Sequence, residues 1–524
     1  MAKRYKILLA ALLLVLLGGG LLWNSLMSKA VSVAQTQVLA KANENINGKL
    51  SVGSIDFSFS GSMTARQITV YDRANAVIGT CDQMVVRFGL WDLLSGNLDP
   101  QSLQSITLDN PVILVDNKEG RWNWEDLFRS ESDQPLKYRG RVEINQGSVA
   151  TGSLDNRKLS SLTGTIDFAQ YPSLALDLTA KRGNSPLTAK GLWAFDGDGK
   201  LEIKTDQLSL GDLPLDEFTQ ADFTLDGGLV KGAVVTVIQQ AGKLSFAGSG
   251  TFEKLAATIA GFSLSEGTGK FDLTDTQIGL HDMAVLVNGQ SVAVDGTISM
   301  AKTGFNIVLN ASSSHFDPAA IVGDSFQGPI AFNANIEGPA ITPLAKGQFS
   351  IPQGAFAAVS FTNVSGNFAY SGGVLTLSDT RGNAWDGTLA ASGDIVPATK
   401  RYKMTVDGSG VDSSLLTEKD IKGRVNFAAY ISGQGTTGGN AEGSFNMGEG
   451  SFSGIPFSSL NGNFVKQGEK VSFSNITVHT LAGTFHADGY SDGNVVRLRQ
   501  LDAPVNPRAI LEKAVTDQLK RLIH

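Results

Sequence analysis

The chain has 524 residues, a formal net charge of −7 and a single cysteine. Its length allows several domains, its negative charge argues against nucleic-acid binding, which needs a basic surface, and one cysteine cannot form an internal disulfide. Charged residues make up 18 % of the chain and glycine occupies 59 positions, against about 25 % and about 7 % in ordinary domains. This composition favours a large β-sheet with many turns.

The N-terminal segment has the features of a membrane anchor. Basic residues among the first six precede an apolar run at positions 7–23, which reaches the roughly 20 residues needed to cross a bilayer once Leu26 and Met27 are counted. Basic residues before such a helix favour a cytoplasmic N-terminus and an exported body. We therefore expect a single-pass anchor in residues 1–27. A cleaved signal peptide is the alternative.

Residues 28–48 are predicted to continue as an amphipathic helix that ends at Gly48. Such a helix would lie between the membrane and the first strand, where it could cap the end of the sheet. Apolar residues recur every three or four positions and form one stripe: Val31, Ala34, Val38, Ala42 and Ile46.

Residues 49–135 are predicted to form short strands. Apolar residues alternate at Ile55 and Phe57, a turn follows at Gly61-Ser62, and alternation resumes at Ile68 and Val70, which indicates a hairpin. Further along, a strand–proline–strand segment around Pro111 leads into the sequence Gly120-Arg121-Trp122-Asn123.

The Gly120-Arg121-Trp122-Asn123 sequence, the Pro111 segment and the membrane helix followed by the Val52-Gly53-Ser54-Ile55 strand resemble the N-terminal region of the AsmA/TamB-like family. The resemblance covers residues 1–150 as a motif and the later residues as architecture. It implies an anchor in the bacterial inner membrane, a periplasmic body, and a long, curved, repetitive antiparallel sheet with a taco-like apolar groove. It also implies phospholipid transfer between inner and outer membranes, or a role in envelope homeostasis.

Residues 136–505 are predicted to form this β-groove. Strand 330–336 alternates apolar and polar residues, as expected of a strand with one covered face. Glycines are expected in the turns or bulges between strands, as at Gln146-Gly147 and Gly408-Ser409-Gly410. We expect the groove to be lined by apolar residues of the alternating strands: Leu244, Phe246, Phe305, Ile307, Phe332, Ile336, Phe349, Phe427 and Phe445.

An internal repeat lies within this region. Residues 347–393 match residues 443–489 without a gap, and the shared residues are mainly glycine and phenylalanine. Shared positions include Gly347/Gly443, Phe349/Phe445 and Gly366/Gly462. A long period of this kind indicates a repeated block of several strands, in which each block covers its apolar face by stacking on its neighbours.

The C-terminus is predicted to form a second amphipathic helix. Residues 502–506 resemble a linker, Pro507 suits the first turn of a helix, and residues 507–524 carry an apolar stripe beside the basic Lys513, Lys520 and Arg521. This helix would either cap the sheet or bind a membrane or partner surface.

The sequence contains no recognisable catalytic or metal-binding pattern. His479 and His486 flank Gly483 without a nearby pair of carboxylates, which favours surface histidines over a zinc site. Cys81 is expected to be a small buried apolar residue. We therefore expect neither enzymatic activity nor a cofactor.

Two hypotheses of different classes follow. The first is non-enzymatic lipid handling, with phospholipid acyl chains and the inner membrane as partners. The second is an anchored scaffold that assists outer-membrane protein assembly or secretion, with an outer-membrane protein as partner. A surface adhesin and a repeated β-sandwich that binds nothing are further alternatives.

Overall fold

The computed structural model describes residue 43 and residues 46–502, with gaps at 59–60, 89–102, 119–120, 124–126, 128–137, 154–155, 195–196, 213–222, 242, 260–261, 302–303, 319–325, 357–358, 417–419, 436, 469 and 493–494. The expected anchor (1–27), most of the expected helix at 28–48 and the expected C-terminal helix (507–524) lie outside the described residues. No helix among the described residues combines the length and hydropathy required to cross a bilayer.

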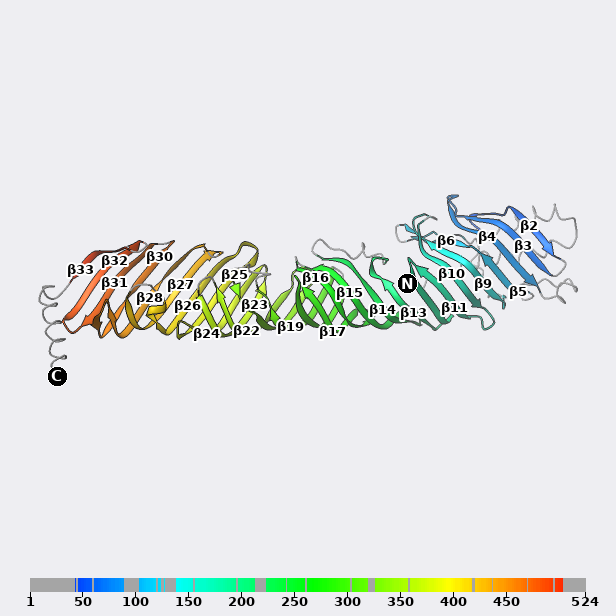
Figure 1. Cartoon of the computed structure of the whole chain (residues 1–524). Coiled ribbons are helices and arrows are strands. Elements are labelled where there is room, and N and C mark those ends of the chain that lie inside the picture. Colours follow the sequence, from blue (N-terminus) through cyan, green and yellow to red (C-terminus); the bar gives the residue numbers. More distant parts are fainter. Residues whose placement is uncertain are drawn as a thin grey trace. The chain divides into compact units, whose positions relative to one another are not determined.

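The chain divides into two compact units. The first comprises Met1–Thr219, Leu225–Leu255 and Thr268–Gly279, and the second comprises Gln220–Thr224, Ala256–Gly267 and Leu280–His524. Nearly all described residues lie in strands, and 31 strands pair into one mixed sheet (Figure 1). The expectation of a mostly β chain with one long sheet is confirmed.

The strands up to the boundary between the units are β1 (Lys49–Ser51), β2 (Ser54–Ser58), β3 (Ser62–Tyr71), β4 (Val77–Phe88), β5 (Leu103–Asp109), β6 (Val112–Leu114), β7 (Asn117–Lys118), β8 (Arg121–Trp122), β9 (Arg141–Ala150), β10 (Arg157–Asp167), β11 (Ser173–Arg182), β12 (Ser185–Ala194), β13 (Gly199–Ser209), β14 (Phe223–Gln240), β15 (Lys243–Ile259), β16 (Phe262–Thr274) and β17 (Gln277–Val287).

Strands β14–β17 are divided between the two units. The strands that lie wholly in the second unit are β18 (Gln290–Ala301), β19 (Gly304–Phe316), β20 (Phe326–Gln327), β21 (Ile330–Pro339), β22 (Leu344–Phe356), β23 (Val359–Ser371), β24 (Val374–Ala384), β25 (Gly387–Val396), β26 (Arg401–Asp412), β27 (Ile421–Gln434), β28 (Thr437–Phe452), β29 (Ile455–Phe457), β30 (Ser459–Gln467), β31 (Lys470–Thr480), β32 (Gly483–Asp492) and β33 (Val495–Asp502). The helical turns are η2 (Leu210–Asp212), η4 (Pro397–Thr399) and α5 (Ser413–Leu416).

The N-terminal strands depart from the expected antiparallel order. Strands β5 and β6 both pair with β9 in parallel, whereas the other described pairings are antiparallel. A parallel pair needs a long crossover rather than a tight turn. The chain between β6 and β9 supplies it, and β7 and β8 form a separate two-stranded sheet within that crossover.

The side chain of Asn123 hydrogen-bonds this crossover to the end of β6. Its side-chain Nδ2 donates to the backbone oxygen of Leu114 (2.8 Å), and its Oδ1 accepts from the backbone N–H of Asp116 (3.1 Å). The residue therefore closes the β7–β8 hairpin onto the sheet. In the Gly120-Arg121-Trp122-Asn123 sequence, the amide has a structural function that the pattern of aromatic residues did not predict.

The first unit contains a filled hydrophobic core at its N-terminal strands. Seventeen buried residues from β2–β5, β9–β11 and the adjoining segments form one cluster, and Val86, Ile106, Leu108 and Phe168 are fully enclosed. Cys81 belongs to this cluster, as expected of a small apolar residue. The protein's own side chains thus occupy the apolar face of these strands.

In the second unit the sheet is curved, and consecutive strands lie side by side in chain order (Figure 1). Bulges contribute to the bending. Asn363, Asp379 and Asn475 have φ values of 52°, 50° and 53° inside strands, and the strand register shifts beside each of them. A bulge inserts an extra residue, bends its strand and increases its twist.

Two expected turns are instead bulges within strands. Gln146 has φ 57° inside β9, and Gly410 has φ 62° inside β26. Both strands continue past the left-handed residue, so the expectation of a chain reversal there is wrong. A left-handed residue marks a bulge as readily as it marks a turn, and local sequence does not separate the two.

Candidate functional site: the apolar face of the second unit

Each strand of the second unit has one apolar and one polar face. In β26, Tyr402, Met404 and Val406 are half-buried, whereas Lys403 and Thr405 between them are exposed. This alternation follows from the two-residue period of a strand, in which successive side chains point to opposite sides. The register between strands decides whether these apolar positions join into a continuous surface.

The apolar positions of neighbouring strands form one continuous row, which we call the first apolar row. Met404 pairs with Gly393 of β25 on one side and with Ile431 of β27 on the other. At about 4.8 Å between strands, a row of ten strands extends roughly 40 Å. Its members, one from each strand between β18 and β28 except β20, are Val294, Ala311, Ala334, Gly347, Phe368, Leu377, Gly393, Met404, Ile431 and Ala441.

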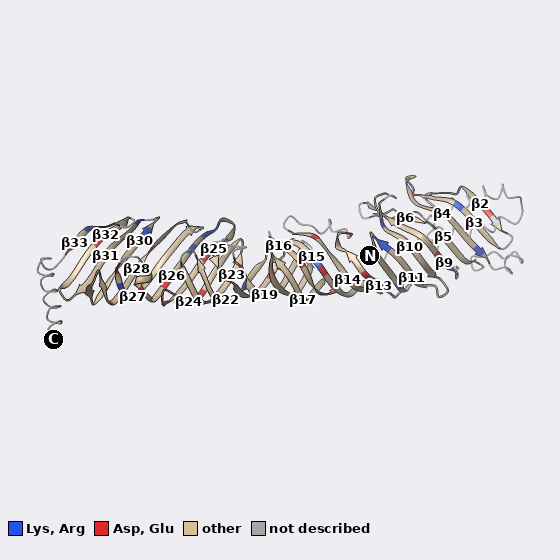
Figure 2. Cartoon of the chain, viewed as in Figure 1, with Lys and Arg blue, Asp and Glu red and all other residues tan. Residues whose placement is uncertain are grey.

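The polar row lies one residue further along the same strands and faces the other side of the sheet. It is polar at every position except Ala369. Its members, in the same strand order, are Asp295, Asn310, Asn335, Lys346, Ala369, Thr376, Asp394, Lys403, Ser432 and Asn440. One face of these ten strands is therefore apolar along the whole row while the other is wet. Charged residues of both signs are scattered over the strands (Figure 2).

A second apolar row continues the same face to the last strand. It lies two residues from the first row, as shown by Ala391 and Gly393 in β25. Its members are Ala391, Val406, Ala429, Gly443, Phe464, Phe473, Gly489 and Leu498. The apolar face thus runs from β18 to β33 within the second unit.

The apolar face is covered only in part. Ala311 and Ala334 are buried, but Phe368, Leu377, Met404 and Ile431 are half-buried, and no residue of the first apolar row is fully exposed. Two clusters of the protein's own side chains pack on this face, one around Ala311 and Ala334 and one around Val411 and Val425. Each contains five buried residues, against seventeen in the core of β2–β5 and β9–β11.

Aromatic rings cover glycines on this face. A Cβ added to Gly366 would lie 3.1 Å from the ring of Phe349 on the neighbouring strand, and one added to Gly347 would lie 2.8 Å from the ring of Phe368. Cross-strand pairs of this kind shield the bare backbone of a glycine inside a sheet. The glycines therefore leave the space that aromatic rings of the neighbouring strands occupy.

The internal repeat reproduces these pairs. Phe349 opposite Gly366 recurs as Phe445 opposite Gly462, and Gly354 opposite Phe361 recurs as Gly450 opposite Phe457. The expectation that the repeat's glycines lie between strands is confirmed for Gly372 and Gly468, which have positive φ values at hairpins, and is wrong for these pairs. The repeat is a pattern of glycine–aromatic contacts across strands.

The expected groove residues divide between the two units. Leu244 and Phe246 belong to the first unit, and Phe246 is exposed. The other seven belong to the second unit, where Ile307 is buried and the rest are half-buried. The register places Phe332 opposite Phe349, Ile336 opposite Leu309, and Phe427 opposite Phe445.

Several members of the apolar rows were missing from the expected set. Phe368 and Phe464 are equivalent residues of the repeat, and Phe473 pairs with Phe464. The repeat could have identified the first two, since both copies carry phenylalanine there. Met404 and Ile431 stand in alternating strands, but their membership of one row depends on register, which is set between distant strands.

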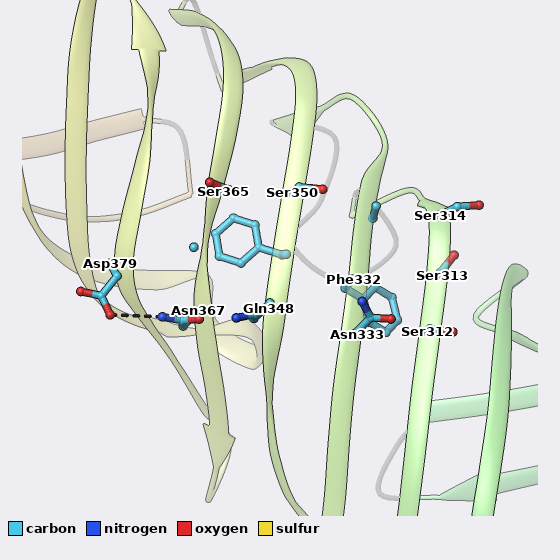
Figure 3. A pocket seen from close by; sticks show the side chains of 13 residues that line it. Ser312, Ser313, Ser314, Phe332, Asn333, Gln348, Ser350, Ser365, Asn367 and Asp379 are labelled. Carbon is cyan, nitrogen blue, oxygen red and sulfur yellow. Dashed lines mark hydrogen bonds between the residues drawn. The ribbon is translucent and has the colours of Figure 1, made fainter.

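A hollow lies across β19–β24, and most of its lining residues are polar. Its volume is about 700 Å³. Ser312, Asn333, Gln348 and Asn367 stand at one level on adjacent strands, and the Nδ2 of Asn367 donates to Asp379 (3.1 Å; Figure 3). Because side chains alternate, the intervening Phe332 and Phe349 point to the apolar face. Both phenylalanines nevertheless contribute to the lining of the hollow, so it includes residues of the candidate groove as well as polar ones.

The described residues offer little acid–base chemistry. No three His, Cys, Asp or Glu side chains gather there as a possible metal site. His479 and His486 are exposed, and each ring lies within hydrogen-bond distance of a threonine hydroxyl, Thr484 and Thr477. Asp412 has a lowered pKa because the Ser414 hydroxyl and backbone N–H both donate to its carboxylate.

Comparison with known protein families, curated proteins and solved structures finds no match to this chain.

Proposed function

We propose that this protein binds phospholipid acyl chains on the apolar face of its second unit and passes phospholipid between the inner and outer membranes without acting as an enzyme. The observation that supports this proposal is that, over ten strands, each residue of the first apolar row stands next to a residue of the polar row that faces the other side of the sheet. A surface of this kind can shield hydrocarbon from water on one side, while the polar side of the sheet stays solvated.

The energetics favour acyl chains as the occupant. Each buried methylene contributes about 0.8 kcal/mol, so ten methylenes along the row would contribute roughly 8 kcal/mol before the entropic costs of ordering the chain. The polar row points away from this face, so a lipid headgroup would remain in solvent. Such a site selects for hydrocarbon and only weakly among headgroups.

The proposal includes a membrane anchor at residues 1–27 and a periplasmic body. An anchor would keep the sheet at the membrane from which lipid is taken. The AsmA/TamB-like resemblance of residues 1–150 supports this arrangement. Because the protein's own side chains fill the core of β2–β5 and β9–β11, the proposal places lipid on the second unit.

The test is the lipid content of two matched variants of the full chain. Phe332→Asp with Ile336→Asp places two carboxylates on the apolar face, whereas Asn333→Asp with Asn335→Asp places them on the polar face of the same strand. After purification from membranes, bound lipid is extracted and measured by mass spectrometry. We expect the apolar-face variant to lose most of its phospholipid and the polar-face variant to retain it. Equal lipid content in all three proteins would reject the proposal.

The second candidate function, a scaffold for outer-membrane protein assembly, is supported by the last strand. Among the described strands β33 pairs only with β32, and its Leu498 and Leu501 are 59 % and 53 % exposed. An unpaired strand edge can bind a partner strand through main-chain hydrogen bonds. Crosslinking from position 498 in whole cells separates the candidates, because a protein adduct supports the scaffold and a lipid adduct supports transfer.

A further inference from the structure

The sheet of the second unit has two rims, formed where its strands end, and the two rims differ in chemistry. Antiparallel strands joined by hairpins place their loops alternately on one rim and on the other (Figure 1). One rim includes the β25–β26, β30–β31 and β32–β33 loops, and we call it the basic rim. The opposite rim includes the β24–β25, β26–β27, β28–β29 and β31–β32 loops, and we call it the apolar rim.

Cations gather on the basic rim. Its lysines and arginines lie in these loops or within three residues of the adjoining strand ends, they are exposed, and none of them forms an ion pair with another described residue. They are Lys400, Arg401, Lys403, Lys466, Lys470 and Arg497. Within the same distance of these strand ends, Asp394 is the only described side chain that is acidic, and it lies opposite Lys403. The rim therefore carries an excess of positive charge.

The apolar rim has a different composition. It exposes large apolar side chains in its loops and strand ends, namely Leu415, Leu416, Phe452, Ile455 and Leu481. Its charged residues include the acidic Asp386 and Asp412. Its cation Lys422 is already paired, since its Nζ lies 3.9 Å from Oδ1 of Asp420. An anion would thus meet a counter-charge at the basic rim and repulsion at the apolar rim.

The first apolar row lies next to the basic rim. In β26, Met404 stands three residues from Arg401 at the basic rim and eight residues from Asp412 at the apolar rim. At about 3.4 Å per residue, these separations are roughly 10 Å and 27 Å. Lysine and arginine have flexible stems that carry their charge away from the backbone. The basic rim is therefore the rim that can reach the headgroup of a lipid whose acyl chain lies on this row.

Lys466 places a charge on the apolar face itself. It stands opposite Ala441, the last member of the first apolar row, so the two side chains point to the same side of the sheet. Val471 stands opposite Lys466 on the next strand and continues the apolar positions. The equivalent residue in the first copy of the repeat is Tyr370, so the fold of the repeat does not require a cation here. An exposed cation among apolar residues, close to the rim, suits the phosphate of a bound lipid.

Two cations of the rim recur with the repeat. Continuing the alignment of the two copies places Arg401 at the position of Arg497, and it places Lys403 at the position of Arg499. Arg499 lies over the ring of Tyr490, with 5.1 Å between its Cζ and the ring centroid. Such a contact holds a cation in place without neutralising it. Both copies therefore begin the same strand with a pair of cations, as expected if these charges serve one function along the rim.

Phosphate is the anion that these observations favour. Lysine and arginine bind phosphate through charge-assisted hydrogen bonds, and a phospholipid carries its phosphate beside its acyl chains. The amine of phosphatidylethanolamine cancels that charge, whereas phosphatidylglycerol keeps it. We propose that the basic rim binds the phosphate of phospholipid lying on the first apolar row and gives the protein a preference for anionic headgroups. The inference rests on the proposed lipid function and adds a recognition of headgroups that the apolar rows alone do not provide.

The test measures which phospholipid the full chain retains from an equimolar mixture of phosphatidylglycerol and phosphatidylethanolamine with identical acyl chains. The protein is loaded in a non-ionic detergent and re-isolated, and the bound lipids are measured by mass spectrometry. Arg401→Gln with Lys466→Gln removes two exposed cations that have no ion pair to lose, so folding is preserved. We expect the ratio of bound phosphatidylglycerol to phosphatidylethanolamine to fall about fivefold, since each exposed cation contributes a few-fold to the binding of an anion.

A matched control removes the same charge elsewhere. Arg381→Gln with Lys422→Gln takes two cations from β24 and the apolar rim and should leave the ratio unchanged. Lys466→Arg keeps the charge and should keep the preference. Raising the salt concentration to about 0.5 M should weaken the preference of the unmodified protein, because exposed charges are screened.

Each outcome decides the proposal. A ratio that the basic-rim variant lowers and the control variant does not lower supports it. An unmodified protein without preference, an unchanged ratio in the basic-rim variant, or equal falls in both double variants overturns it. So does a basic-rim variant that keeps the ratio but no longer floats with phosphatidylglycerol vesicles, because the rim would then bind a membrane surface. Phospholipid retained without preference refutes this inference alone, whereas no retained phospholipid in any of the proteins refutes the proposed function as well.

Discussion

Phe349 lies directly opposite Gly366 on the neighbouring strand, and its ring occupies the space in which a side chain at Gly366 would stand. The same relationship joins Phe445 to Gly462 in the second repeat. Two copies of one contact show what the repeated residues have in common, since in each a phenylalanine ring lies 3.1 or 3.2 Å from where a Cβ on the opposite glycine would stand. The apolar face is therefore built from pairs of residues rather than from single hydrophobic positions.

Replacing a close-packed glycine should destabilise the sheet. A Cβ at Gly443 would overlap the backbone oxygen of Ala428, so Gly443→Ala forces adjacent strands apart. We expect a loss of about 1–3 kcal/mol, measured by urea unfolding. Gly448→Ala in the same strand is the control, because a Cβ there meets nothing within 4 Å. It should be neutral or stabilising by roughly 0.5 kcal/mol, and equal losses in the two variants would contradict this explanation.

Removing the hydroxyl of Thr380 should stabilise the protein. Its Oγ1 is buried without a hydrogen-bond partner among the described residues, and such a group costs about 1–3 kcal/mol. Thr380→Val keeps the shape and removes the unpaired atom, so we expect a gain near 1 kcal/mol. Thr376→Val is the matched control, since that hydroxyl donates to Asp394 (2.7 Å) and its loss should give no gain. A destabilised Thr380→Val would show that the hydroxyl is satisfied.

A carboxylate supports the bulge at Asn475. The backbone N–H of Asn475 donates to Asp488 Oδ1 (2.8 Å), and the N–H of Asp282 donates in the same way to Asp295 (2.7 Å). Asp488→Ala removes the acceptor, and we expect about 1 kcal/mol of destabilisation together with faster amide exchange at Asn475. Asp488→Asn keeps an acceptor oxygen and should restore most of the protection. Unchanged exchange in Asp488→Ala would exclude this function of the carboxylate.

The stability of the first unit should fall at alkaline pH. Burial raises the pKa of the Cys81 thiol from 9.0 to about 12, so the folded protein holds this proton more tightly than the unfolded chain. The resulting stabilisation is complete below pH 9 and is lost as the pH rises toward 12, by at most about 1.4 kcal/mol per pH unit. Burial also raises the pKa of Tyr138 in the same core.

The measurement compares the pH dependence of unfolding in the unmodified protein and in Cys81→Ala. The variant loses the thiol and should show a shallower decline above pH 9, with the remaining slope due in part to Tyr138. Native protein should also resist thiol reagents at pH 8 until it unfolds. Identical slopes, or rapid labelling of the folded protein, would show that the thiol is accessible.

The two-residue alternation of apolar and polar residues predicted many of the strands of this fold. Alternation identified the strands around Phe305, Phe332, Met404 and Phe427, because side chains on a half-covered sheet repeat every two residues. The hairpin of β2 and β3 was also predicted, with its turn before Ser62. Cys81 was correctly placed in a core, where a lone thiol behaves as a small apolar residue.

Register and bulges could not be predicted in the same way. The parallel pairing of β5 with β9 depends on a crossover whose path is set by contacts between distant segments. Left-handed residues such as Gln146 and Gly410 suit a turn and a bulge equally well. That Met404 and Ile431 stand side by side in the first apolar row depends on the pairing of β26 with β27, and the sequence of neither strand alone indicates it.

The central claim is that hydrocarbon lies on the apolar face, and site-specific photocrosslinking in living cells tests it most directly. A photoreactive phenylalanine analogue is placed at Phe368 or Met404 of the first apolar row, and at the adjacent Ala369 or Lys403 of the polar row. We predict phospholipid adducts at positions 368 and 404 and none at positions 369 and 403. Absence of lipid at the first pair, or equal labelling of both pairs, would contradict the account.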